Sequence, residues 1–507
     1  MTRRQATVFY GSHLALSALL LAVLVPFGEW PLRVPFDYRG DGVIHAALVK
    51  GVAEDGPWRL TRIGAPFGCD IADWPMGMWL PLAVTSALVR LTGHPGTALN
   101  LYWLLTIVAT GLSATWALGR LRVLPGAAFV CGLLYAFLPY VFYRNTSHFG
   151  TMYPLVPLVA LLALRVAGAS PEEQHRAERR ITLLACFAQG LSYVYYAFFG
   201  CLLLGVAAAV AWLRTRRLRT GRLAATGILL LALGSAVPLV PSFLYWHEHG
   251  RNGQLAYKTA ADAEIYALKL RHLLTPIDDH PLAPFRAIAA RAREARFPLE
   301  NENTTARLGL VGSLGLLVLL GLTVAGLSGA VGPDHALGPA AALSLTALLF
   351  AQVGGLGSIF SIVVANDIRG YNRIVVFIAF FSFYASAVML SRTLVRFMAS
   401  PWLRWLALAA VCAFGVSDQV PRSFLAAVRA DTAPAFAEDE SFVALLESGL
   451  PRGAMVFQLP DATIPLDLDS RPPMMTYDPG RAYVSSRSLR WSWGSITGRG
   501  DWQAQTS

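Results

Sequence analysis

VYYAFFGCLLLGVAAAVAWLRTRRLR, the stretch from residue 194 to residue 219, joins an apolar run to a cluster of arginines. A helix needs about 20 predominantly apolar residues to cross the hydrocarbon core of a bilayer. The run 194–212 meets that length, and the arginines that follow it are typical of the cytoplasmic side of a membrane. The stretch therefore predicts a transmembrane helix whose C-terminal end faces the cytoplasm.

Apolar runs of this kind recur along the chain. The clear ones lie near 8–27, 97–117, 124–143, 150–167, 194–212, 222–245, 307–329, 338–361, 374–391 and 401–417. Shorter runs at 76–92 and 181–192 are interpreted as short spans, re-entrant segments or helices lying in the membrane interface. We therefore predict an all-α polytopic membrane protein with about 11 to 12 spans.

The composition of the 507 residues agrees with this class. Hydrophobic residues make up 55% of the chain and charged residues only 14%, whereas about 25% of the residues in a soluble domain are charged. The net charge of +11 is spread over short loops, which favours a role in topology over nucleic-acid binding. Four of the five cysteines lie in apolar runs and no C-x-x-C pair is present, so neither a zinc site nor a disulfide framework is supported.

The arginine clusters predict which loops face the cytoplasm. These clusters are Arg120 and Arg122; Arg176, Arg179 and Arg180; Arg214, Arg216, Arg217 and Arg219; and Arg392, Arg396 and Arg404. The first span is expected to stay uncleaved with its N-terminus inside. The segments expected outside are 28–75, 143–151, 193–196, 246–306, 362–373 and the tail after Ser417. If 28–75 lies outside and Arg120 lies inside, the region 76–117 must cross the membrane an odd number of times. We therefore interpret 76–92 as split or not fully spanning.

Two domains are expected. Residues 1–417 form the transmembrane domain with its outside loops 28–75 and 246–306, the second of which holds an amphipathic helix near 284–296. Residues 418–507 form a small outside α/β domain, with a helix at 434–449 and strands at 454–459 and 483–488. This tail stops at Ser507, just after Trp502 and without a closing element, so we expect it to be shorter than its relatives.

Two polar segments of the first outside loop hold candidate site residues. In Tyr38-Arg39-Gly40-Asp41-Gly42, Asp41 follows the first span and is interpreted as a general base or cation ligand, or alternatively as the cap of a helix starting near Val43. Asp73, beside the interfacial Trp74, is either a second functional acid or part of a membrane-surface turn. Asp37, His45 and Lys50 lie in the same loop and are candidate substrate ligands.

Further polar segments lie between spans or in the tail. His148 in Arg144–His148 could bind a phosphate or a sugar, or belong to a capping turn. Arginine suits bidentate contacts with phosphate, so Asn366–Arg373 is a candidate phosphate site, with lipid-headgroup contact as the alternative. Glu302 and Asn303 are candidates for sugar or cation binding, or alternatively belong to a solvated loop. Asp478, Arg490 and Trp491 are candidates for carbohydrate stacking or, alternatively, for the core of the tail. No P-loop and no nucleophile elbow are present.

In their order, these segments resemble the GT-C superfamily of membrane glycosyltransferases. An early acid after the first span, many spans, a second outside loop and an outside C-terminal domain follow one another as in that superfamily. Within it, an uncharacterised bacterial GT-C-like family is similar over nearly the whole chain. The segments that carry the resemblance are Gly40–Gly42, Gly64–Gly68, Asp73–Met76, Asn100–Tyr102, Asn301–Asn303, Arg369–Ile374, Met455–Pro460 and Leu489–Gly494.

The resemblance implies a site and an activity. Asp41 matches the catalytic acid, with Asp37 as the alternative position, and Asp73 and Glu302 would complete the catalytic set. A divalent cation, Mg²⁺ or Mn²⁺, would be held by Asp41 and Glu302. Arg369, Asn372 and Arg373 would bind the phosphate of a polyprenyl-phosphate sugar, and a hydroxyl of a glycan, lipid or protein would accept the sugar. The protein would lie in the bacterial inner membrane, with its site and C-terminal domain outside.

Two other functions stay open. A transporter or flippase of lipid-linked saccharides would be expected to place charged residues deep within its spans, whereas here nearly all charges lie at the ends of the spans. A non-catalytic membrane protein of polysaccharide assembly is the third interpretation.

Overall fold

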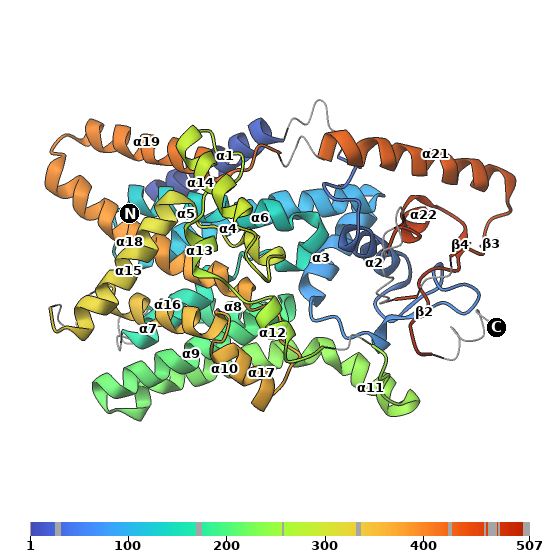
Figure 1. Ribbon diagram of the computed structural model, residues 1–507, viewed down its shortest axis with the longest axis horizontal. Coiled ribbons are helices and arrows are strands. Elements are labelled where there is room, and N and C mark those ends of the chain that lie inside the picture. Colours follow the sequence, from blue (N-terminus) through green and yellow to red (C-terminus); the bar gives the residue numbers. More distant parts are fainter. Residues whose placement is uncertain are drawn as a thin grey trace.

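The computed structural model describes residues 2–25, 32–168, 175–255, 258–330, 336–423, 428–460, 463–464, 474 and 477–499. Helices fill most of the molecule (Figure 1). The N-terminus lies towards one end of the long axis, and α2, α22 and the short strands β2, β3 and β4 lie towards the other. The fold class predicted from the sequence, a helical polytopic bundle with a small α/β tail, is confirmed.

Eight helical stretches in the described part of the chain are long and apolar enough to cross a membrane. They are α1 (Arg3–Leu24), α4 (Pro95–Arg120), α5 with α6 (Pro125–Arg144), η2 with α7 (Thr146–Ala167), α9 (Val194–Thr215), α10 with α11 (Arg222–His249), α15 (Gly309–Leu327) and η7 with α18 (Tyr371–Phe397). The expected 11 to 12 spans also included the shorter apolar helices α3 (Trp79–Thr92) and α16 (Gly338–Ala351), and the helices α8 (Arg176–Ser192) and α19 (Pro401–Gln419).

Several predicted spans are broken, because proline and glycine interrupt the helical hydrogen-bond ladder. Pro139 begins α6 (Pro139–Arg144) after α5 (Pro125–Ala136), and Pro238 lies in the turn η5 (Val237–Leu239) between α10 (Arg222–Ala236) and α11 (Val240–His249). The predicted continuous span 338–361 is wrong. It ends with α16 at Ala351, turns through Gly354 at φ +69°, and resumes as α17 (Leu356–Val363).

The loop 28–75 is predicted to lie outside and is called the first outside loop; its described residues fold around one helix. α2 (Asp41–Asp55) is followed by the antiparallel strands β1 (Arg59–Leu60) and β2 (Cys69–Asp70) and the turn η1 (Ile71–Asp73). Gly40 is the N-cap residue, at φ +46°, and the helix begins at Asp41 without a side-chain cap. The interpretation of Asp41 as the cap of a helix starting near Val43 is therefore wrong.

The loop 246–306, also predicted to lie outside and called the second outside loop, contains α12 (Asp262–Ile265), α13 (Leu270–Leu274), α14 (Ala283–Glu294) and η6 (Glu302–Thr305). The helix predicted near 284–296 is α14. η6 immediately precedes α15, so the polar residues of η6 lie where a span begins.

The tail contains α21 (Ala433–Gly449), preceded by the π-turn η8 (Val428–Thr432), and then β3 (Met455–Val456), α22 (Gly480–Ser485) and β4 (Arg490–Trp491). β3 and β4 pair in parallel. The helix predicted at 434–449 is confirmed, and only two residues of the predicted strand 454–459 are in β3. The predicted strand 483–488 is wrong, because α22 covers its first half and packs against α2. Trp502 lies outside the described residues.

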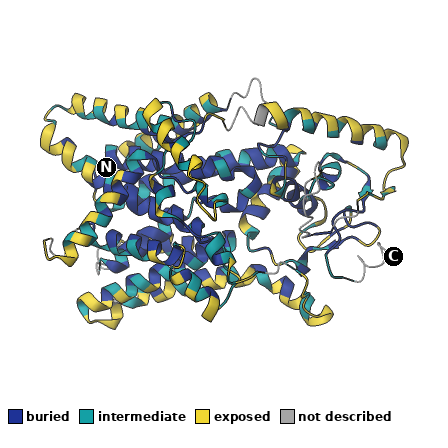
Figure 2. Cartoon of the chain, viewed as in Figure 1, coloured by how far each residue is buried: buried dark blue, intermediate teal, exposed yellow. Residues whose placement is uncertain are grey.

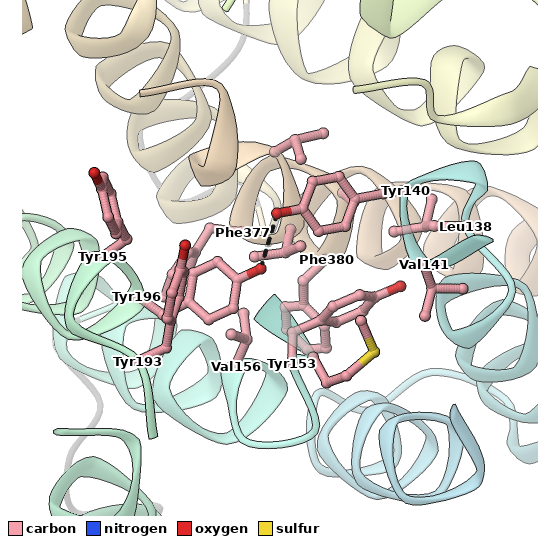
Figure 3. Packing of buried hydrophobic residues seen from close by; sticks show 14 of the residues in the cluster. Leu138, Tyr140, Val141, Tyr153, Val156, Tyr193, Tyr195, Tyr196, Phe377 and Phe380 are labelled. Atoms are coloured by element: carbon pink, nitrogen blue, oxygen red, sulfur yellow. Dashed lines mark hydrogen bonds between the residues drawn. The ribbon is translucent and has the colours of Figure 1, made fainter. Parts of the chain in front are cut away.

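The core of the bundle is rich in aromatic residues. Buried residues occupy its interior and exposed ones its outer faces (Figure 2). The Tyr140 and Tyr196 hydroxyls lie 3.2 Å apart, and a dashed line joins them in Figure 3. The Tyr196 hydroxyl donates to the Thr151 carbonyl at 2.6 Å. Buried tyrosines need such partners for their polar ends. The cluster therefore fixes η2 (Thr146–Thr151), a segment that lines the candidate site.

Candidate active site

One cavity of about 260 Å³ gathers segments that are far apart in the sequence. Its walls come from the start of α2, the segment 74–78, η2, the start of α9, Lys258 and η7 (Tyr371–Ile374). The residues that line it are Asp41, His45, Trp74, Pro75, Met76, Gly77, Met78, His148, Gly150, Thr151, Tyr193, Val194, Tyr195, Lys258 and Arg373. Four residues predicted from the sequence, Asp41, His45, His148 and Arg373, therefore share one pocket.

Asp41 and His45 lie four residues apart on α2, so their side chains share one helix face. The Oδ2 atom of Asp41 lies 3.2 Å from Nε2 of His148. Nδ1 of His45 lies 2.5 Å from the Ser147 carbonyl oxygen, so Nδ1 carries the proton and donates it. This leaves Nε2 of His45 as a lone-pair acceptor on a side chain that lines the cavity.

The charges of these groups follow from their surroundings. Burial raises the pKa of Asp41, but the hydrogen bond from His148 and the electrostatic interactions with the basic groups His148, His45 and Arg373 lower it more, to about 2. Burial lowers the pKa of His45, and the charge of Asp41 offsets only part of that effect. At neutral pH the cavity therefore presents an ionised carboxylate beside a neutral imidazole.

Arg373 is held by a carboxylate that it shares with Arg144. Glu302 Oε2 accepts from Arg144 Nη1 at 2.7 Å, and Glu302 Oε1 accepts from Arg373 Nη2 at 3.3 Å. The Asn372 amide also donates to Glu302 Oε1, at 3.2 Å. Burial raises the pKa of Glu302, but the guanidinium groups of Arg373 and Arg144 lower it further than burial raises it. The carboxylate is therefore ionised and fixes both arginines.

The guanidinium of Arg373 has N–H groups that its contacts with Tyr193 and Glu302 do not use. Its Nη1 donates to the Tyr193 hydroxyl, and its plane lies over the Tyr195 ring at 4.5 Å. Its Nε–H is buried and has no hydrogen-bond partner. A buried unpaired donor costs free energy unless a ligand or water satisfies it. Because Arg373 lines the cavity, a phosphate that entered it would meet a guanidinium able to form a charge-assisted hydrogen bond.

Asp73 lies outside this pocket. Its buried carboxylate accepts from the Trp246 indole at 2.9 Å, from the Asn252 amide at 3.0 Å and from Arg499 at 2.6 Å. These contacts tie η1 to α11 and to the end of the tail. Asp73 thus fixes the start of the segment 74–78, which lines the cavity, and its catalytic role stays a prediction.

Three other predicted ligands also make structural contacts. The Lys50 ammonium donates to the carbonyls of Tyr483 at 2.6 Å, Val484 at 3.1 Å and Ser486, at the end of α22. Asn303 is buried and donates to the carbonyls of residues 265 and 299. The Asp37 carboxylate accepts from the Arg39 backbone in the turn before α2. None of the three lines the cavity.

The remaining predictions divide between the neighbourhood of the cavity and the tail. Asn372 is buried and hydrogen-bonds Glu302 and the Tyr266 carbonyl, and Arg369 stacks on the Tyr266 ring at 5.0 Å. Arg490 donates to the carbonyls of Thr61 and Pro66, which docks the tail on the first outside loop. Asp478 and Trp491 line a separate cavity of about 490 Å³ inside the tail.

Sequence reasoning did not single out Lys258, Tyr193 and Tyr195 as lining residues, or Arg144 as the partner of Glu302. Arg144 and the two tyrosines stand beside span ends, a position that could have marked them. Lys258 lies in the middle of a polar loop, where no pattern distinguishes it; its Nζ donates to the Asp367 carbonyl at 2.8 Å.

The residues present do not fit the divalent cation that the sequence resemblance implies. Both oxygens of Glu302 already accept from guanidinium groups, and Asp41 is paired with His148. Mg²⁺ and Mn²⁺ need several free oxygen ligands. Among the residues that the structure describes, no group of three histidine, cysteine or acidic side chains is arranged to hold a metal ion.

Comparison with known proteins identifies the fold. No protein-family model and no curated protein sequence matches the chain. The crystal structure of ArnT from Cupriavidus metallidurans, bound to undecaprenyl phosphate, is similar over 99% of this chain and 88% of that one, with 13% identity and a TM-score of 0.50. The oligosaccharyltransferase of Archaeoglobus fulgidus, solved with Zn and sulfate, is similar over 95% of this chain and 62% of that one, with 11% identity and a TM-score of 0.37.

At this identity the likeness to ArnT establishes a shared fold, and the second likeness is too weak to add to it. The chain is thus a polytopic membrane protein that shares the fold of ArnT.

Proposed function

We propose that this protein is a glycosyltransferase that moves a sugar from a polyprenyl-phosphate donor to a hydroxyl of a glycan, lipid or protein. The observation that carries the proposal is the cavity that joins Asp41 and His45 to Arg373. On one side, Asp41 and His45 can accept the proton of the acceptor hydroxyl. On the other side, Arg373 can donate hydrogen bonds to the donor phosphate. The fold shared with ArnT, which was crystallised with undecaprenyl phosphate, supports a lipid phosphate as part of the donor.

In this proposal the donor phosphate lies against Arg373. The Nε–H of Arg373 donates to a phosphate oxygen, and the ammonium of Lys258, on the same cavity wall, adds positive charge. As the bond between the anomeric carbon and the phosphate oxygen breaks, negative charge grows on the phosphate. Fixed positive groups stabilise that charge more in the transition state than in the ground state.

The acceptor hydroxyl lies on the opposite side, against α2. Its oxygen forms the new bond to the anomeric carbon, and its proton passes to Nε2 of His45, the neutral base in the cavity. Asp41, ionised and paired with His148, orients the hydroxyl and stabilises the imidazolium that forms. The products are the glycosylated acceptor and the polyprenyl phosphate.

The proposed setting is the outer face of a bacterial inner membrane, with the N-terminus in the cytoplasm and the tail outside. In the structure α7, α9 and α18 all begin at the cavity and end at Arg165, Arg214 and Arg392 or close to them. Arginine-rich ends face the cytoplasm, which supports an external site.

The test is transfer by the purified protein in nanodiscs. Wild type, Asp41→Asn and the surface control Glu438→Gln are incubated with mannosyl, glucosyl and galactosyl polyprenyl phosphates and a cell-envelope acceptor fraction. We expect the wild type and the control to release polyprenyl phosphate, and Asp41→Asn to be at least about a hundredfold slower. Equal turnover in all three would remove Asp41 from its role. Movement of the lipid across the bilayer without cleavage would favour a flippase.

A further inference from the structure

A groove on the side of the bundle lies away from the candidate active site. Its floor is α5, where the Phe129 ring meets His13 of α1 at 4.7 Å between centroids. α19 packs on α5 at Gly126, where an added Cβ would clash with Leu408. α1 and α19 both pack against α5 but scarcely contact each other. The space between them is a cavity of about 780 Å³ (α1, α5 and α19 in Figure 1).

The lining of this groove is apolar except near one end. Leucine, valine, alanine and phenylalanine side chains of the three helices make its walls. Ser417 and Arg422 lie at the end where α19 finishes, and Arg422 is the single charged lining residue among those described. Trp405 lies near the other end of α19 and is largely exposed.

The charged end of the groove is on the same side of the membrane as the candidate site. Asp418, next to Ser417, is buried and accepts from Nε2 of His280 at 2.9 Å. His280 belongs to the second outside loop, which also supplies Glu302 to the site. The end of the groove that carries Arg422 therefore lies on the side of the bundle that carries the candidate site.

The length of the groove matches one leaflet. From Trp405 to Ser417 the axis of α19 rises by about 18 Å, at about 1.5 Å per residue. One leaflet contributes about 15 Å of hydrocarbon. A phospholipid acyl chain extends over this depth, whereas a polyprenyl chain is several times longer than the groove.

We propose that this groove is a binding site for an anionic phospholipid of that leaflet. One acyl chain lies along α5 between α1 and α19, and the headgroup phosphate lies against the Arg422 guanidinium. Anionic lipids are attracted to arginine at the membrane surface, an effect of about fivefold in affinity per residue. The bound lipid bridges α1 and α19, which have few direct contacts. The site is independent of the proposed transferase activity.

The experiment uses the full chain, delipidated in detergent and titrated with phosphatidylglycerol, with phosphatidylethanolamine or with undecaprenyl phosphate, and read by native mass spectrometry. We expect one phosphatidylglycerol to bind most tightly. Arg422→Gln should lower its affinity about fivefold. The double variant Ala409→Phe/Ala413→Phe fills the groove from exposed positions of α19 and should abolish tight binding.

Matched controls lie outside the groove. Arg396→Gln removes an exposed arginine of α18, and Ala410→Phe adds the same bulk to another exposed face of α19. Both should bind phosphatidylglycerol like wild type. The proposal is overturned if the groove-filling variant binds as tightly as wild type, if Arg422→Gln has no effect, or if undecaprenyl phosphate alone occupies the groove.

Discussion

The pKa values of His45 and Asp41 predict how the transfer rate depends on pH. Burial holds the pKa of His45 below the usual value of about 6.5, and Asp41 with a pKa of about 2 stays ionised throughout the working range. If His45 is the base, kcat/KM is constant above pH 6.5 and falls at lower pH, as the imidazole takes up a proton. The measurement is the pH profile of transfer between pH 5 and pH 8.

The variant His45→Gln should be slower by about a hundredfold and should lose the acidic fall. His249→Gln, which changes an exposed histidine stacked on Tyr245, should keep the profile of the wild type. The lowered pKa of His45 also affects the free energy of unfolding. Because the pKa of His45 is lower in the folded than in the unfolded chain, unfolding takes up a proton as pH falls below 6.5, and stability falls with it. If transfer by His45→Gln still falls at acidic pH as it does in the wild type, the base is another group.

The sequence could predict individual site residues only where polarity was out of place. Asp41, His148 and Arg373 stand out because they interrupt an apolar chain at span ends, and the structure brings them to one cavity. Lys50 and Asp73 are also polar residues in an apolar chain, but the side chain of each forms hydrogen bonds that join distant segments of the protein. A charge buried against the protein's own backbone and a charge facing a ligand look alike in sequence.

At the scale of elements, Glu302 joins three segments. It lies in η6 and pairs with Arg144 at the end of α6 and with Arg373 in η7; only 2% and 15% of these two side chains are exposed. Glu302→Gln would leave two guanidinium groups beside each other without their counter-charge. Breaking a buried ion pair costs about 3 to 5 kcal/mol.

We expect Glu302→Gln to lower the free energy of unfolding by about 3 kcal/mol. Thermal unfolding in detergent measures the loss as a lower Tm. Glu294→Gln neutralises an exposed carboxylate at the end of α14 and serves as the control, with a Tm close to that of the wild type. Equal Tm values for the two variants would show that the Arg144–Glu302–Arg373 contacts add little.

Lys50 joins α2 to the tail. Its ammonium fills the C-terminal end of α22, where three backbone carbonyls converge on it, and lies 4.6 Å from the centre of the Tyr483 ring. Lys50→Met keeps the length of the side chain but removes the donor, so these carbonyls lose their partner. The tail should then separate from α2 more often.

Limited proteolysis measures that separation. We expect cleavage within the tail to be about tenfold faster in Lys50→Met, whereas Arg452→Met, an exposed tail residue, should be cleaved like wild type. Equal rates in Lys50→Met and wild type would mean that other contacts, such as those of Arg490, suffice to dock the tail.

The sequence predicted the existence of most helices better than their continuity. Apolar length locates α4, α9, α15 and α18, because lipid accepts only helices with all their backbone groups paired. The break at Gly354 and the helix α22 depend on tertiary contacts. A Cβ added to Gly355, next to Gly354, would lie 2.4 Å from the Leu349 carbonyl oxygen. The C-terminal end of α22 is held by the Lys50 ammonium. Such contacts leave no periodic signal along the chain.

At the scale of the whole molecule, the two ends of the bundle differ in chemistry. One end carries the candidate site, and the other a cavity of about 610 Å³ lined by Arg122, Arg165, Arg214 and Arg392. α9, with 22 residues, joins the two ends over about 33 Å, which is close to the thickness of a bilayer's hydrocarbon core. The arginines that are predicted to set the topology therefore gather at the end of the bundle opposite the candidate site.

This segregation predicts which serines can be reached from each side. Ser441 lies exposed on α21 in the tail, and Ser328 lies exposed just after α15, a helix that starts beside Asp418 and ends at the opposite side of the bundle. Single substitutions Ser441→Cys and Ser328→Cys, in right-side-out membrane vesicles, are treated with a membrane-impermeant maleimide. The native cysteines are buried or half-buried, and wild type measures their background.

The positive-inside rule requires the arginine-lined end to face the cytoplasm, because arginine-rich loops are retained on that side during insertion. We therefore expect the cysteine at 441 to react in intact vesicles and the cysteine at 328 to react only after detergent opens them. Reaction at 328 alone would invert the topology and place the candidate site in the cytoplasm, where a donor presented at the outer leaflet could not reach it. Reaction at both positions in sealed vesicles would mean that α15 does not separate them across the bilayer.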